Sequence, residues 1–172
     1  MNVIVSNSIR FVLLVLVQVL ILNNLEVGAG IYPMLYPLFI LLLPIEMATV
    51  TLMFVSFFFG LTIDAFSNTF GLHASAAVVF AFFRPLVFKL FAPRDGFEMG
   101  EMNAMNLLAV RWFIVSYIVL LFIHHTWFFI IEVFKWNEFL LILQKIILSV
   151  PISFGLSLLV RTAFMDKSKK ER

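Results

Sequence analysis

The chain has 172 residues, of which 63% are hydrophobic and 22 are phenylalanine, and a formal net charge of +2. Soluble domains contain about 45–50% apolar residues. Here the excess lies in long blocks, which predicts an all-α integral membrane protein and excludes a β-barrel, whose strands alternate polar and apolar residues. The chain has no cysteine, which excludes disulfides and thiolate chemistry, and its basic residues lie at the ends of apolar segments instead of forming a nucleic-acid-binding surface.

Six apolar segments predict one transmembrane domain over residues 1–172. The expected helices cover residues 9–24, 31–44, 49–66, 73–91, 107–131 and 139–160, with a polar cytoplasmic loop at 92–106 and a solvated basic tail at 161–172. In the first helix, Gln18 is the strongly polar residue. The segment 31–44 is short for a hydrocarbon layer of about 30 Å, and Pro33 and Pro37 interrupt its start. A short or tilted span and a re-entrant element therefore both stay open.

The distribution of Lys and Arg predicts the orientation. With six spans, both termini lie on one side of the membrane, and every Lys and Arg except Lys135 and Lys145 falls on that side. Positive residues are enriched on the cytoplasmic side. The sequence therefore predicts cytoplasmic N and C termini.

The third and fourth expected helices carry the most specific pattern. Small and polar residues recur every four positions along the third helix: Ser56, Gly60, Asp64 and Asn68. A carboxylate in lipid costs about 2.5–3.5 kcal/mol, so Asp64 is expected to face protein or a wet cavity. An antiparallel hairpin brings Asp64 level with His73 across the turn. The polar cluster expected there consists of Asp64, Ser67, Asn68 and His73.

Two interpretations of this cluster remain open. It binds a ligand or transfers a proton, or its groups satisfy one another and lock the turn; the second is favoured, because one Asp and one His without a nucleophile do not form an active site. The small residues that open the fourth helix allow close approach to Gly60. A further small stripe, which we expect to pack helices, contains Ser149, Ser153 and Ser157.

Other polar residues have local explanations. Arg84 either snorkels to the cytoplasmic interface or pairs with Glu46. The adjacent His124 and His125 point to different faces of a helix and make a poor metal site, so we expect them at the membrane interface. A phosphate-binding glycine loop, a nucleophile elbow, a zinc-ligand spacing and paired carboxylates are all missing from the sequence. We therefore expect a protein that is not an enzyme and that holds no metal or cofactor.

Three stretches together resemble the MreD family, the small membrane subunit of the bacterial cell-elongation machinery. They are NNLEVGAGIYPMLYPLFILLLPIE from Asn23, GLTIDAFSNTFGLHASAAVVFAFFRP from Gly60, and APRDGFEMG followed by LLFIHHTWFFIIEVF in the loop and fifth helix. The second stretch is the most specific, with Gly-x-x-x-Asp, a turn, Gly-x-His and a small-residue helix. The third is similar to the version found in Bacteroidota.

The resemblance implies a non-enzymatic scaffold in the bacterial cytoplasmic membrane. Such proteins bind the bitopic protein MreC and help couple MreB filaments to peptidoglycan synthesis by RodA and a penicillin-binding transpeptidase. The resemblance also implies the six-helix fold of the substrate-binding subunits of energy-coupling-factor transporters. Its marker positions are Pro33, Pro37, Pro44, Glu46, Asp64, Gly71 and His73.

With Gly60 and Asn68, the marker positions around Asp64 are expected to shape an outer cavity and hairpin that receive a partner helix. A vitamin-binding subunit of such a transporter is the alternative. Those subunits carry a stripe of small residues in the first helix, whereas the segment from Phe11 to Leu22 contains no Gly, Ala or Ser.

Overall fold

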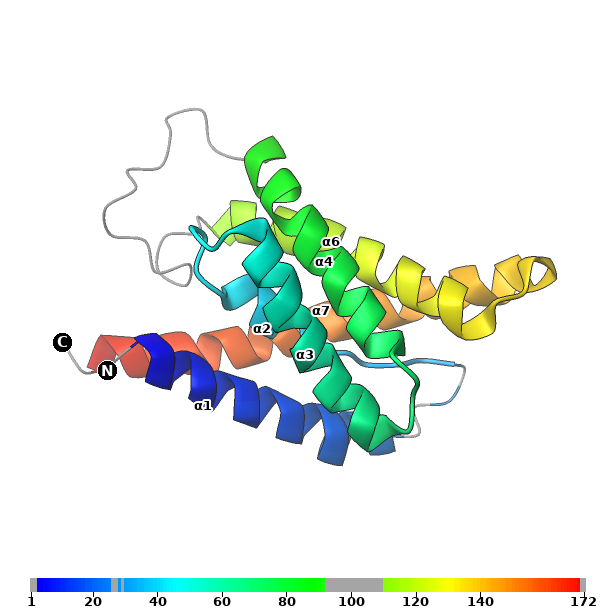
Figure 1. Cartoon of the computed structure of the whole chain (residues 1–172), viewed down its shortest axis with the longest axis horizontal. Coiled ribbons are helices and arrows are strands. Elements are labelled where there is room, and N and C mark those ends of the chain that lie inside the picture. The colour runs from blue at the N-terminus through cyan, green and yellow to red at the C-terminus, as the bar shows by residue number, and fades with distance from the viewer. Residues whose placement is uncertain (1–2, 26–27, 29, 92–109, 171–172) are drawn as a thin grey trace.

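A computed structural model of the protein describes residues 3–25, 28, 30–91 and 110–170, and in these residues it contains helices and no strands, which confirms the all-α prediction. The long helices are α1 (Val3–Leu16), α3 (Thr49–Ser67), α4 (Leu72–Leu90), α6 (Val110–Val133) and α7 (Phe139–Lys170) (Figure 1). A π-helical turn (Val17–Ile21) and a 3-10 turn (Leu22–Asn24) extend α1. In this part of the chain, 5 helices are long and apolar enough to cross a membrane, which makes this a multi-pass membrane protein.

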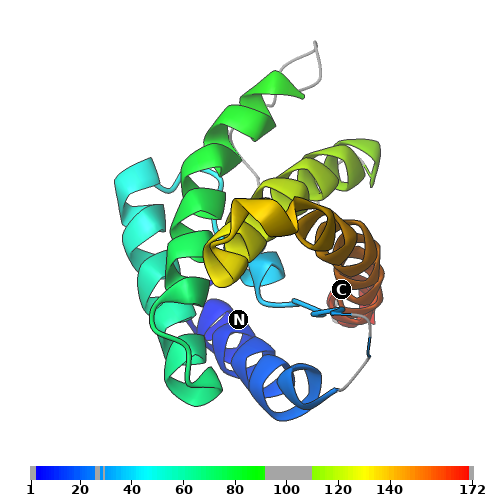
Figure 2. The ribbon, with the colours of Figure 1, turned by 90° about the vertical axis from the view of Figure 1, so that its right-hand side faces the viewer.

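Two antiparallel hairpins form most of the bundle. In the first, α3 and α4 lie so close that a Cβ atom built on Gly60 would be 2.5 Å from the Cα atom of Ala74. In the second, α6 returns as α7, and α6 packs on the other side of α4 (Figure 2). The Trp127 indole near the end of α6 donates to Ser75 Oγ near the start of α4, at 3.3 Å. Both hairpin turns therefore lie at one end of the bundle, which we call the turn end.

The helix expected over residues 31–44 is not formed. Residues 31–35 lack regular secondary structure, and only α2 (Pro37–Leu42) is helical, with Pro37 at its first position. A helix of 6 residues is about 9 Å long, too short to cross a bilayer. All six α2 residues are buried, so this helix lies inside the bundle and not against lipid.

The direction of α1 shows where this segment runs. The Phe11 and Phe59 rings are 4.9 Å apart, and the Asn23 side-chain amide donates to Ser67 Oγ at 2.6 Å. Contacts that advance together along both helices mean that α1 and α3 run side by side in the same direction. The chain between them therefore returns from the turn end to the end where the N and C termini lie (Figure 1).

The last expected helix is longer than predicted. Helix α7 continues to Lys170, so the residues from 161 to 170, expected as part of the basic tail, are helical. This extension contains good helix formers and neither Gly nor Pro, so nothing in it ends the helix. The polar loop expected at 92–106, and the first residues of the helix expected from 107, lie outside the described residues.

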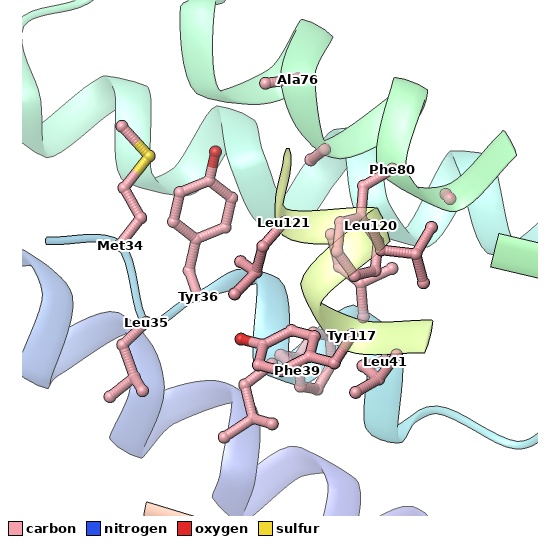
Figure 3. Close-up of a cluster of buried hydrophobic side chains, with 14 of the residues drawn as sticks. Met34, Leu35, Tyr36, Phe39, Leu41, Ala76, Phe80, Tyr117, Leu120 and Leu121 are labelled. Atoms are coloured by element: carbon pink, nitrogen blue, oxygen red, sulfur yellow. The ribbon is translucent and has the colours of Figure 1, made fainter. Parts of the chain in front are cut away.

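The core of the bundle surrounds α2 (Figure 3). The largest fully buried side chains include Tyr36, Phe59, Phe80, Tyr117 and Phe129. Large apolar side chains also cover the outside of the bundle, among them Phe54, Phe58, Leu86, Leu140 and Leu159. An apolar core inside an apolar exterior is the distribution expected where lipid replaces water as the solvent.

Candidate functional site

The carboxylate of Asp64 is bound by four hydrogen bonds at the turn end. Its Oδ1 atom accepts from Thr69 Oγ1 at 2.5 Å, from the backbone N–H of His73 at 3.0 Å and from His73 Nδ1 at 2.9 Å. Its Oδ2 atom accepts from the backbone N–H of Ala74 at 2.9 Å. Asp64 is 2% exposed, so these bonds replace its hydration.

These contacts make Asp64 the N-terminal cap of α4. His73 and Ala74 are the second and third residues of that helix, and their N–H groups have no partner within it. Gly71 takes the capping position with φ of 80° and supplies no side chain, so the carboxylate of the preceding helix does so. The geometry is the one expected if the cluster locks the turn.

The other predicted members of the cluster do not hydrogen-bond to the Asp64 carboxylate. Asn68 is exposed and ends α3 in the left-handed conformation, with φ of 55°. Ser67 bonds Asn23 of the 3-10 turn after α1 and not Asp64. Gly60 brings the helices together, as its contact with Ala74 shows. Thr69, which the four-residue spacing did not mark, is the residue that joins the carboxylate.

A second polar network lies deeper and includes both histidines of α6. The Tyr36 hydroxyl is 2.5 Å from His124 Nε2. His125 Nδ1 donates to the carbonyl of Leu121 at 2.8 Å, and its Nε2 accepts from Ser153 Oγ at 3.2 Å. Both histidines are 0% exposed, so the prediction that they lie at the membrane interface was wrong. A buried tyrosine hydroxyl needs a hydrogen-bond partner. Tyr36 inside an apolar segment was therefore the signal in the sequence for a contact with a polar side chain such as His124.

The segment 31–36 is held by side chains on both sides. On α7, Ser149 Oγ accepts from the Tyr32 N–H at 3.0 Å, and Ser153 Oγ accepts from the Met34 N–H at 2.9 Å. Two members of the serine stripe of α7, expected to pack helices, therefore bind backbone, whereas the third, Ser157, bonds the Tyr117 hydroxyl of α6 at 2.7 Å. Non-helical backbone at membrane depth is tolerated only where protein satisfies it.

Gln18 performs the same function from α1. Its Oε1 accepts from the Leu35 N–H at 2.8 Å and the Tyr36 N–H at 3.4 Å, and its Nε2 donates to the Pro33 carbonyl at 3.1 Å and to Asn23 Oδ1 at 2.8 Å. It lies in the π-helical turn, and such turns occur often at functional positions. All four hydrogen-bonding positions of its amide are used.

Arg84 binds the other end of the same segment. Its guanidinium, 2% exposed, donates to the carbonyl oxygens of Leu41, Leu43 and Pro44. No hydrogen bond or ion pair joins it to Glu46, both being described residues, so the expected pair is not formed. The Glu46 carboxylate is exposed and keeps its hydration, whereas the carbonyls at the end of α2 have no helical partner and need a donor.

A cavity of about 360 Å³ lies at the turn end beside these contacts. Its lining includes Gln18, Leu22, Asn23, Ile31, Met34 and His73. Within the described ranges, no three His, Asp or Glu side chains come close enough to hold a metal ion. In comparisons with protein families, with curated proteins and with solved structures, nothing matches this chain.

Proposed function

We propose that this protein is a scaffold in the bacterial cytoplasmic membrane, of the MreD type that its sequence resembles. The observation that carries the proposal is the use of the Asp64 carboxylate, whose four hydrogen bonds all go to the turn and the first residues of α4. The most specific polar group of the resemblance thus fixes the shape of a hairpin. A fixed shape is what a binding platform requires.

In this proposal the chain crosses the membrane six times, with both termini in the cytoplasm. The parallel course of α1 and α3 supports a crossing between them, made by extended chain and α2. Lys135 and Lys145 then lie at the outer end, and the remaining Lys and Arg on the cytoplasmic side. The turn end is therefore the outer end.

The partner that we propose is the membrane helix of MreC, received at the turn end, with RodA, its transpeptidase and MreB in the wider complex. Support comes from the two aromatic side chains next to the Asp64 cap: Phe66 is 67% exposed and Phe70 is 102% exposed. Aromatic residues on a rigid backbone are favoured anchors at protein interfaces.

Affinity purification in mild detergent, with identification of bound proteins and small molecules, tests this role. We expect an MreC-type protein to co-purify. Asp64→Asn should weaken its recovery while the protein still inserts, because one oxygen that accepts a hydrogen bond becomes an NH₂ group, which cannot accept one from a backbone N–H of α4. Glu138→Gln is the control, since it makes the same charge change in the other turn, where Glu138 pairs with Lys135 at 3.4 Å.

Unchanged recovery in the Asp64→Asn variant would argue against partner binding at this hairpin. A retained vitamin without any partner protein would instead favour the transporter subunit.

A further inference from the structure

We propose that the cavity at the turn end is a binding site for an uncharged molecule that carries an amide group on a small apolar body. This inference goes beyond the scaffold role and does not depend on it. The cavity has about 360 Å³, near the lower end of the roughly 300–1,000 Å³ typical of small-molecule sites.

The first polar group of the lining that the proposal uses is the imidazole of His73. Its Nδ1 atom lies 2.9 Å from Asp64 Oδ1, and because a carboxylate oxygen only accepts, Nδ1 carries the proton. In the neutral imidazole, the Nε2 atom is then a hydrogen-bond acceptor. It has no hydrogen-bond partner among the described residues, and His73 lines the cavity. A ligand N–H or O–H group would donate a hydrogen bond to this Nε2 atom.

The second group is the amide of Asn23. It donates one N–H to Ser67 Oγ at 2.6 Å and accepts from Gln18 at 2.8 Å, which leaves one N–H free for a ligand carbonyl. The neighbouring Gln18 has no hydrogen-bonding position left. One free acceptor and one free donor on two side chains that line the same cavity match the N–H and the C=O of an amide.

The rest of the lining indicates that the ligand is uncharged and has an apolar body. The described lining side chains include no Asp, Glu, Lys or Arg, and the nearby Lys145 ammonium already pairs with Glu132 at 2.8 Å. The described lining therefore offers no charged group to replace the hydration of an ionised ligand. Leu22, Leu25, Ile31 and Met34 present apolar surface. A soluble amide and the amide-bearing head of a lipid share this chemistry.

Benzamide is a suitable probe, with benzoate and toluene as the charged and the apolar controls. The chain has three histidines, so ¹⁵N-histidine labelling of the full-length protein in nanodiscs gives three imidazoles, and the His73→Gln variant assigns one of them. We expect benzamide to shift the Nε2 resonance of His73 and to leave those of His124 and His125 in place. Benzoate and toluene should not cause this shift.

A pair of tryptophan variants locates the site. Leu22→Trp fills the cavity and should weaken benzamide binding at least tenfold, whereas Leu20→Trp, at a neighbouring position that is 64% exposed, should leave it unchanged. Mass spectrometry of a solvent extract of the purified protein then distinguishes a lipid from a soluble ligand.

The proposal is overturned if benzamide shifts none of the three imidazoles or if toluene shifts the same resonance equally. Equal affinity of the two tryptophan variants would also overturn it. The wild-type comparison of the three probes needs no variant, so a misfolded Leu22→Trp protein would not prevent the test. Recovery of a partner protein plays no part in these readouts, which keeps this proposal separate from the scaffold role.

Discussion

Ser153 on α7 accepts a hydrogen bond from the backbone N–H of Met34 at 2.9 Å, although the two residues are 119 positions apart in the chain. The segment around Met34 has neither a helix nor a strand to pair its backbone. The Gln18 side chain and serine side chains of α7 do so instead. Buried polar residues in this protein therefore complete the backbone of a segment that would otherwise be unstable in a membrane.

Replacing Ser153 with Ala should destabilise the protein by about 1–3 kcal/mol, because the buried N–H of Met34 loses its acceptor and Nε2 of His125 loses its donor. The measurement is reversible unfolding in bicelles. Ser56→Ala is the matched control: Ser56 is equally buried, and its hydroxyl has no hydrogen-bond partner among the described residues, so its removal should cost nothing. Equal losses in the two variants would mean that serine packing, and not the bond to Met34, matters.

Replacing Arg84 with Met should lower stability by about 1.5–3 kcal/mol, since the carbonyls at the end of α2 lose their charged donor. The variant also loses the contact of the guanidinium with the Phe88 ring, at 4.9 Å from its centroid. Glu46→Gln should leave stability unchanged, because Arg84 does not pair with it. Thermal unfolding of both variants checks this. A loss of stability in Glu46→Gln as large as that in Arg84→Met would mean that Arg84 does pair with Glu46.

Replacing Gly60 with Ala should separate α3 from α4 and cost about 1–3 kcal/mol, because the new methyl group would overlap the backbone of Ala74. The control is Gly155→Ala on α7, where a Cβ atom meets nothing within 4 Å. That change should be neutral or stabilise by up to about 1 kcal/mol through helix propensity. The same unfolding assay checks both variants, and a harmless Gly60→Ala change would show that the helices are not in close contact there.

The sequence alone predicted those parts of the fold that local pattern determines. Apolar length marked α3, α4, α6 and α7, and the antiparallel hairpin predicted from the turn placed Asp64 level with His73. Close packing at Gly60 followed from small residues on the facing helix. Each of these features depends on residues within one hairpin.

The segment 31–44 could not be predicted in this way. Its apolar residues resemble a short helix, and the groups that stabilise it as extended chain lie on α1 and α7. The roles of His125 and Ser153 could not be predicted either, because their partners also lie far away in the sequence. From the sequence, His125 was expected at the membrane interface and Ser153 in helix packing. A periodic pattern identifies a buried face, but it does not identify the backbone group that this face will bind.

The crossing between α1 and α3 is tested most directly by single-cysteine labelling. The chain has no cysteine, so Asn24→Cys and Ala48→Cys can each be made as the single reactive thiol, and both positions are exposed. In right-side-out vesicles we predict that a membrane-impermeant maleimide labels Cys at position 24 at once and Cys at position 48 only after permeabilisation. Labelling of both positions from the same side would contradict a return of the chain through the membrane at residues 31–48.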